Sequence, residues 1–453
     1  MIESRVVRSA AFTAFLAACL TFSGKARAEG VPQPVELPAQ LSLDASMQLL
    51  RTRSLDLLIA EAAVKSAEGD IGVAGAVPNP AISLGYGRVL NYDPTAVCGI
   101  NNGAVVGGCS PNQYTLGLSD QAAIEDSLSG KRDLRLKVAN RALAAAKLQR
   151  NDALRNLEFQ VKSAYAQVEQ AQRGLALAKE VQATNVKTLQ LFQVRRTAGD
   201  INDGDLARIE TQKLEADQAV DTAVQSLRQA RFALAFLLGV RGPVPEFAVD
   251  DKGLDFAVRS ALANADLDRL LRTAFEHRPD LLALGYQRSS AEAAIALARR
   301  QRFPDITVSA QYTQTGDGQN SIQPPTISVA LSAPIPLFYQ QQGEIKKAEA
   351  NLDTQALSQA KTTAQVVSDV STAVAGYQSA RALVERMEKA LRPSAEKAFV
   401  ITRLQFDKGK ATLMDLLDAQ RTYIATNVEY LQDLTQYWTA VYQVEQAVGM
   451  ELR

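Results

Sequence analysis

The sequence predicts an α+β membrane protein in which two similar halves combine very long helices with short strands. Three observations lead to this prediction. The same order of motifs occurs twice, two stretches carry a long apolar seam at helical spacing, and four short segments alternate strictly between apolar and small polar residues. Coiled-coil rods and strands of the outer-membrane type rarely share one chain, so the combination restricts the possible architectures.

The internal repeat is visible from residues that recur at matching spacings. Gly199 and Asp205 in the first half correspond to Gly409 and Asp415 in the second half at one constant offset. Each half is predicted to contain a helix, a strand pair, a very long helix, a glycine break and a returning helix. The chain is therefore divided into residues 1–28, a signal peptide; residues 29–42, a proline-rich N-terminal segment; residues 43–239, the first repeat; residues 240–265, an inter-repeat segment; and residues 266–453, the second repeat.

Residues 1–28 have the features of an export signal. Arg5 and Arg8 precede a short apolar run at residues 9–22, and the small residues around Arg27 fit a cleavage site after Ala28. A second interpretation stays open, because the residues up to Cys19 resemble a bacterial lipobox in which Cys19 would be lipidated. Either interpretation predicts an exported protein. No later segment has 18 consecutive apolar residues, so no membrane-spanning helix is predicted in the mature chain.

The two other cysteines, Cys98 and Cys109, lie in a polar loop at residues 91–112 that is rich in glycine and asparagine. In an exported protein, a short-range disulfide between them is the natural prediction, and two free thiols are the alternative. No histidine flanks the pair, and two ligands do not make a zinc site.

Long rods are predicted in both halves. Residues 135–195 contain no proline, and Gly174 is their only glycine. Apolar side chains recur there at alternating steps of three and four residues, as in a coiled-coil seam: Leu154, Leu157, Val161, Ala164, Val168, Ala171 and Leu175. The second copy repeats the seam at Val366, Val370, Ala373, Tyr377, Ala380, Val384, Met387 and Leu391. A helix of about 60 residues is roughly 90 Å long, so it must lie against partner helices, including the returning helices at residues 205–238 and 415–448.

Four strands are predicted, at about residues 80–90, 112–120, 304–313 and 326–334. In the first of them, Ile82 and Leu84 alternate with Ser83 and Gly85. Strict alternation of apolar and small polar residues over about 8–10 positions is typical of outer-membrane strands. A small, half-buried soluble sheet is the alternative that this pattern leaves open.

If these strands lie in a membrane, one chain is too small to close the sheet. An unpaired sheet edge cannot face lipid, because each unsatisfied backbone group costs several kcal/mol there. Membrane barrels have at least about eight strands, so several chains would have to share one barrel. The long polar loops at residues 91–112 and 314–325 would then face the outside.

Three stretches together resemble one family. They are Arg278-Pro279-Asp280-Leu281, then Arg302-Phe303-Pro304-Asp305-Ile306 leading into a strand, then Gly409 followed by Asp415-Leu416-Leu417-Asp418-Ala419-Gln420. With them, the chain resembles the outer membrane efflux protein (TolC) family over about residues 40–452. Residues 129–132 and 334–345 further resemble the CzcC-like branch, which serves heavy-metal efflux systems of the resistance-nodulation-division type.

The resemblance implies a TolC-like homotrimer. Each chain would contribute four strands to a shared twelve-strand β-barrel in the outer membrane of a Gram-negative bacterium, and its long helices to an α-helical barrel through the periplasm. It also implies a periplasmic adaptor (membrane fusion) protein and an inner-membrane pump as partners. These implications answer both problems above: the strands are too few to close, and the rods are too long to pack alone.

The resemblance also places a periplasmic gate at the hairpin tips. The tips correspond to the turns around Gly199 and Gly409, and the aspartates that line the gate correspond to Asp415 and Asp418. A spacing of three puts both carboxylates on one face of a helix, where three-fold symmetry would form two rings that attract cations. A basic residue that locks the gate in some members is absent, because Ala411 occupies its place.

The first repeat keeps half of this gate. Asp205 matches Asp415, Arg208 stands at the place of Asp418, and Asp200 and Asp203 add charge at the same turn. In the second repeat, Lys410 is adjacent to Ala411 and could replace the missing basic residue. Helix capping is the alternative role for Asp205 and Asp415, because each follows a glycine turn and opens a helix.

Other functions are excluded by what the sequence lacks. His277 is the only histidine, and no metalloprotease, serine-hydrolase or paired CxxC motif occurs, so we expect no enzyme, no cofactor and no metal site. Basic and acidic residues number 49 each, which gives no basic surplus for nucleic acid.

The sequence therefore predicts the passive exit duct of a tripartite efflux system, with divalent heavy-metal cations as the cargo that the CzcC-like stretches favour. Two alternatives remain. The duct could carry drugs or a secreted polypeptide, or the chain could be a periplasmic coiled-coil scaffold or adaptor without a pore.

Overall fold

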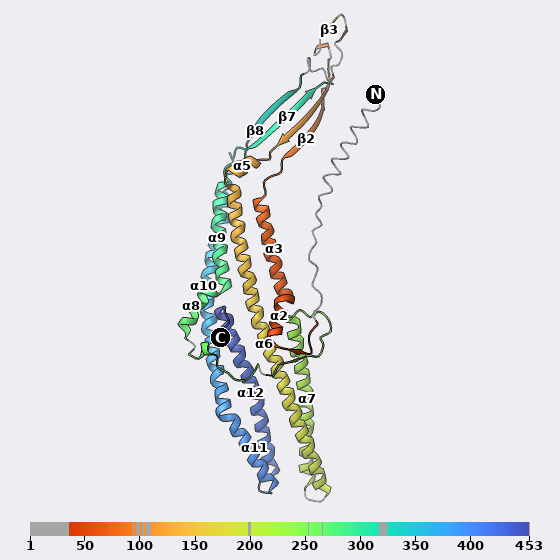
Figure 1. The fold of residues 1–453 in the computed structure, drawn as a ribbon, viewed down its shortest axis with the longest axis vertical. Helices are drawn as coiled ribbons and strands as arrows, with labels where there is room; N and C mark the ends of the chain where they lie inside the picture. Colours follow the sequence, from red (N-terminus) through yellow and green to blue (C-terminus); the bar gives the residue numbers. More distant parts are fainter. Residues whose placement is uncertain are drawn as a thin grey trace.

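The computed structural model describes residues 36–93, 95–96, 100–101, 104–105, 110–197, 201–251, 253–264, 266–316 and 324–452. Several predicted features lie outside these described residues, namely the signal peptide, Cys19, Cys98, Cys109, Gly199 and Asp200. The molecule is long and narrow. A strand layer forms one end, helices run through the middle, and two helical hairpins form the other end (Figure 1).

The first half begins with a two-residue strand and two short helices and continues into the sheet and a helical hairpin. Its elements are β1 (Gln40–Leu41), α2 (Leu43–Arg53), α3 (Leu55–Gly75), β2 (Ala81–Arg88), β3 (Ile100–Asn101), β4 (Ala104–Val105), β5 (Asn112–Ser119), α5 (Ala123–Leu128), α6 (Lys131–Thr197) and α7 (Asp203–Leu237). The 67 residues of α6 make a rod of about 100 Å. The loop predicted at residues 91–112 contains the short β3–β4 pair, which the alternation did not indicate.

The second half follows a connecting segment with β6 (Ala248–Val249) and a 3₁₀ turn at Ser260–Leu262. Its elements are α8 (Leu267–His277), α9 (Pro279–Arg300), β7 (Thr307–Thr315), β8 (Thr326–Ser332), α10 (Gln342–Arg386), a π-helical segment (Met387–Leu391), α11 (Arg392–Asp407) and α12 (Leu413–Val448). The long helix is thus interrupted. Pro393 has no N–H to donate to the carbonyl of Lys389, and the helix widens just before it.

The four long strands form one antiparallel sheet in the order β2-β5-β7-β8. The register aligns Leu84, Leu116, Tyr312 and Ile327 in one row across all four strands. Because side chains alternate along each strand, this row and its equivalents form an apolar face. Leu84 is 69% exposed and Ile327 is 78% exposed, so the described residues leave that face uncovered.

Small and polar side chains occupy the opposite face of the sheet. Ser83, Gly117, Gln311 and Ser328 align in the neighbouring row. Gly117 allows a close approach there, because a Cβ at this position would lie 2.4 Å from Oγ of Ser83. The sheet is therefore two-sided, with one apolar face and one polar face.

Two apolar cores lie in the middle of the molecule, one in each half. In the first, residues of α6 and α7 pack with α2, β1 and β6. In the second, α10 and α12 pack with α8 around Tyr377, Tyr437 and Trp438. The connecting segment joins the two cores, since its Val249 belongs to the first and its Leu254 to the second. Tyr437 also donates a hydrogen bond of 2.9 Å to the carbonyl of Ala257 in this segment.

The return helices end in the same way. Gly239 and Gly449 both have positive φ, of 83° and 85°, after the last turns of α7 and α12. A Cβ built on Gly239 would lie 2.5 Å from the carbonyl oxygen of Arg53. A Cβ built on Gly449 would lie 3.1 Å from Cα of Arg278. Glycine is required at each site for two reasons: the backbone is left-handed, and the end of a neighbouring helix approaches closely. Within the described residues, no helix combines the length and the apolar composition needed to cross a bilayer.

Candidate functional site at the hairpin tips

The turn between α11 and α12 is built by its own sequence. Gly409 has a φ of 69°, and the N–H groups of Gly409 and Lys410 donate to the carbonyls of Phe406 and Gln405, which closes the last turn of α11. Thr412 then caps α12, because its Oγ1 accepts from the Asp415 N–H at 3.2 Å. The sequence Gly-x-x-Thr-x-x-Asp therefore encodes both a helix stop and a helix start.

Asp415 completes this cap rather than projecting freely. Its Oδ2 accepts hydrogen bonds from the Thr412 N–H at 2.9 Å and from the Thr412 hydroxyl at 2.6 Å, a reciprocal capping box. The hydroxyl bond, and after it the backbone bond, lower the pKa of Asp415 below its usual value of 3.8. Asp415 is thus held as a carboxylate and fixed at the first turn of α12.

Asp418 lies one turn further along the same helix and is exposed. Among the residues that the structure describes, its carboxylate makes no hydrogen bond and no ion pair. Of the two predicted gate carboxylates, Asp418 is therefore the one whose charge is left for a ligand or a passing ion.

The tip between α6 and α7 is built differently. Asn202 caps α7, with its Oδ1 accepting from the Asp205 N–H at 2.8 Å. The cap is thus Asn202 rather than Asp205. The preference of asparagine for this position was the signal that sequence reasoning missed.

Both described aspartates of the first tip are paired with arginine. Asp203 accepts from Nε of Arg196 at 2.6 Å, and Oδ1 of Asp205 lies 3.5 Å from Nη1 of Arg208. The Arg196 hydrogen bond lowers the pKa of Asp203 and raises the pKa of Arg196. Both described aspartates of the first tip are therefore paired with arginine, whereas the Asp418 carboxylate of the second tip has no partner among the described residues.

Contacts between the two hairpins lie just above the tips. Nε2 of Gln420 in α12 donates to Oδ1 of Asn185 in α6 at 2.9 Å, and both side chains are buried. Phe192 of α6 stacks on Phe406 of α11 at 6.1 Å between ring centroids. These four residues were not predicted as functional, although a buried amide in an alanine-rich seam is unusual.

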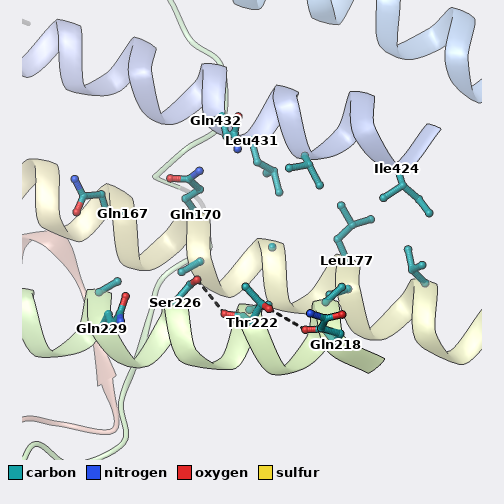
Figure 2. A pocket seen from close by; sticks show the side chains of 18 of the residues that line it. Gln167, Gln170, Leu177, Gln218, Thr222, Ser226, Gln229, Ile424, Leu431 and Gln432 are labelled. Carbon is teal, nitrogen blue, oxygen red and sulfur yellow. Dashed lines mark hydrogen bonds between the residues drawn. The ribbon is translucent and has the colours of Figure 1, made fainter. Parts of the chain in front are cut away.

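A groove of about 930 Å³ lies between α6, α7 and α12, above these contacts. Figure 2 shows Leu177 and Ile424 facing each other across the groove, with Gln218, Thr222 and Ser226 along the α7 side. Its lining is mostly uncharged and includes Gln167, Gln170, Gln218, Gln229 and Gln432. Amides and small apolar groups of this kind provide no cluster of charge that would choose an ion.

The described residues contain no cluster of three or more histidine, cysteine, aspartate or glutamate side chains that could hold a metal ion. His277 is exposed, and its Nδ1 lies 3.1 Å from the carbonyl of Thr273 in the preceding turn.

Comparisons with known proteins agree on one family. The family model "Outer membrane efflux protein" matches residues 46–240 and 270–450. Among curated relatives, the cobalt-zinc-cadmium resistance protein CzcC of Cupriavidus metallidurans is 25% identical, with 92% of each chain covered. The pyoverdine export outer membrane protein OpmQ of Pseudomonas aeruginosa is 23% identical, with 84% of this chain and 80% of the relative covered. Among solved structures, CusC superposes with a TM-score of 0.71 at 17% identity, over 93% of this chain and 97% of that chain.

Proposed function

The chain belongs to the outer membrane efflux protein family, whose members are efflux channels and not enzymes, and we propose that it forms the trimeric exit duct of a tripartite efflux system. The observation that carries this proposal is the open four-stranded sheet with an uncovered apolar face, attached to long helical hairpins.

The sheet supports a barrel shared between copies. Its outer strands, β2 and β8, each have one edge that no described strand pairs with. In lipid, every unpaired backbone group on such an edge costs several kcal/mol, so the edges must pair with other strands. Three chains placed edge to edge would provide twelve strands, with the apolar rows toward lipid and the polar rows toward a water-filled lumen.

Exposed apolar residues also mark where this membrane part ends. Phe303, Ile335, Leu337 and Phe338 are all exposed and lie where the strands meet the helices. Large apolar and aromatic side chains at such a level are typical of the boundary between lipid and water.

The helical hairpins support association along their whole length. Phe236 of α7 is 74% exposed and Leu404 of α11 is 54% exposed, and further exposed apolar residues lie on the same helices. Rods of this length do not fold stably with one side uncovered, so neighbouring copies are the proposed cover. The tips would then meet around one axis, which brings three copies of Asp418 together.

A ring of Asp418 side chains would favour cations at the narrowest point. For the cargo we propose divalent heavy-metal cations. The CzcC relative supports this, since its printed name is that of a cobalt-zinc-cadmium resistance protein. The groove is mostly uncharged, and the described residues hold no cluster of three or more metal-ligating His, Cys, Asp or Glu side chains, so the choice of ion would be made by the inner-membrane pump and the periplasmic adaptor that we propose as partners.

Single-channel recording in planar bilayers tests this proposal. We expect the purified protein to run as a trimer and to form small, cation-preferring channels. Protein that is folded by circular dichroism, yet shows neither trimers nor conductance, would contradict the duct and favour a periplasmic scaffold. For the cargo, the matching test is metal tolerance of cells that lack the protein, compared with tolerance to dyes and detergents.

A further inference from the structure

The strands and the helices meet at two junctions, one in each half of the chain. At the first junction, residues 75–81 and 119–136, β2 and β5 meet α3, α5 and α6. At the second junction, residues 299–306 and 333–350, β7 and β8 meet α9 and α10. Both junctions lie at the end of the sheet that faces the helices (Figure 1). In the proposed duct they therefore reach the same membrane leaflet, called here the helix-side leaflet.

The first junction uses its basic side chains for internal contacts. Lys131 is 5% exposed and lies in an ion pair of 2.5 Å. Arg135 donates two hydrogen bonds to the carboxylate of Asp126, at 2.6 and 2.7 Å. Nε of Arg132 donates to the carbonyl of Gly75 at 2.8 Å. Four acidic residues outnumber these three basic ones, so the first junction has no positive surplus.

The second junction has the opposite balance, with five basic and three acidic residues. Each of its three carboxylates already has a partner among the described residues. The pairs are Asp305 with Lys131, Glu349 with Arg299, and Glu344 with Tyr339. The other four basic side chains are exposed and make no ion pair with a described residue: Arg300, Arg302, Lys346 and Lys347.

Contacts between neighbouring segments hold these four cations in one region. Nη2 of Arg302 donates to Oε1 of Gln340 at 3.2 Å, which ties the end of α9 to the loop before α10. The Arg299–Glu349 ion pair of 3.1 Å ties α9 to α10 itself. The two lysines follow in the second turn of α10, about 6–8 Å along the axis from its first residue. The second junction is therefore a cationic surface at the level where the sheet ends.

Large apolar side chains lie beside the cations and are uncovered. Phe338 is 98% exposed, and Ile335 and Leu337 are 76% and 74% exposed. The guanidinium of Arg300 lies 5.2 Å from the centre of the Phe303 ring. This combination matches a lipid surface, because acyl chains cover the apolar groups while headgroup phosphates pair with the cations. A soluble phosphate would leave the apolar groups in water.

We propose that the second junction binds anionic phospholipids of the helix-side leaflet through their headgroup phosphates, whereas the first junction contacts lipid without selecting its charge. The proposal rests on the proposed function, since it needs the sheet to lie in a membrane. The arginine forks match phosphate oxygens with paired hydrogen bonds, and the lysine stems carry their charge toward the headgroups. Each copy of the chain would carry one such site.

Lipid retention by the purified protein tests this site without any conductance. The protein is equilibrated in detergent with equal amounts of phosphatidylglycerol and phosphatidylcholine that carry the same acyl chains, and retained lipids are counted by native mass spectrometry. We expect phosphatidylglycerol to be retained about fivefold more than phosphatidylcholine. This preference should fall when the equilibration is made at about 1 M salt, because the cations are exposed to solvent.

Variants separate the charge from the apolar contact. Lys346→Gln combined with Lys347→Gln removes two side chains that make no hydrogen bond or ion pair with a described residue, so the fold should persist. The preference should fall about two- to threefold, and adding Arg302→Gln should remove most of the remainder. Phe338→Ser should instead lower the retention of both lipids, because it removes apolar surface and no charge.

The matched control is Lys179→Gln combined with Lys397→Gln, which removes two exposed charges from the helical hairpins and should leave the preference unchanged. Equal retention of the two lipids by the native protein, or an equal loss of preference in the control, would overturn the site. A double lysine variant that loses its trimers but keeps the preference would assign these cations to a contact between copies. Trimers that prefer phosphatidylglycerol yet never conduct would reject the duct and keep the lipid site, and conducting channels that retain both lipids equally would do the reverse.

Discussion

The two hairpin tips lie at the same end of the molecule (Figure 1) and differ in the partners of their aspartates. At the α6–α7 tip, Asp203 and Asp205 each face an arginine. At the α11–α12 tip, Asp415 is held in a capping box by Thr412, and Asp418 has no partner among the described residues. The described aspartates of the two tips therefore differ in their partners. The proposed cation filter belongs to the second tip alone.

Exchanging the charge between the tips should have the largest effect. Asp418→Arg would replace a ring of carboxylates with a ring of cations, and Arg208→Asp would add carboxylates at the equivalent place in the first half. We expect Asp418→Arg to lower the cation-to-anion permeability ratio by about tenfold or more, and Arg208→Asp to raise it. Reversal potentials in asymmetric KCl measure both ratios. Equal shifts in one direction would show that the tips do not differ in the way described.

Loss of a cap should affect each tip to a similar, smaller extent. Thr412→Ala removes the acceptor for the Asp415 N–H, and Asn202→Ala removes the acceptor for the Asp205 N–H. Each substitution should destabilise its first helical turn by about 1 kcal/mol. Hydrogen exchange of these two amides should therefore become about fivefold faster, and Thr412→Ser and Asn202→Asp should retain most of the protection. Unchanged exchange at either amide would assign its helix start to another group.

The caps also show how much of the site the sequence could predict. Gly409 was predicted as a turn, and its φ is positive. This prediction was possible because the left-handed backbone of the turn favours glycine whatever the surrounding side chains are. Asn202 was not predicted as the cap of α7, since Asp200, Asp203 and Asp205 around it compete for the same role. Local preference ranks these residues almost equally, and the fold chooses among them.

The rest of the fold also contains features that the sequence predicts and features that it does not. The strands and the long helices follow from periodicity, so Ile82 and Leu84 were predicted on one side of their strand before its register with β5 was known. The π-helical segment before Pro393 and the Asn185–Gln420 bond depend on how helices distant in sequence meet. No pattern within one helix contains that information.

The stability of both helix starts should depend on pH. Salt should change this pH dependence differently at the two tips. Hydrogen bonds from Thr412 lower the pKa of Asp415, and Arg196 lowers the pKa of Asp203. A carboxyl group whose folded pKa is lowered stabilises the fold above its unfolded pKa of about 3.9, and the stabilisation is lost as pH falls through the folded value. Both helix starts should thus fray below about pH 4.

High salt should weaken the Asp203 contribution, because it comes from an exposed ion pair, and should leave the Asp415 contribution in place. Proton-detected titration of the two carboxyl groups at low and high salt measures this difference. Arg196→Gln should return the pKa of Asp203 toward 3.8, and Thr412→Val should do the same for Asp415. A salt-dependent pKa at Asp415 would contradict the neutral hydroxyl as its cause.

The smallest effect is expected from the second ion pair of the first tip. Arg208 and Asp205 lie 3.5 Å apart at an i,i+3 spacing, with the Arg208 side chain 56% exposed. Such pairs contribute about 0.3–0.5 kcal/mol, because water competes for both groups and ordering the side chains costs entropy. Arg208→Gln should therefore change the exchange rate of the Asp205 amide by no more than about twofold, while Asn202→Ala changes it more. A larger effect of Arg208→Gln than of Asn202→Ala would mean that the arginine, and not the asparagine cap, organises the start of α7.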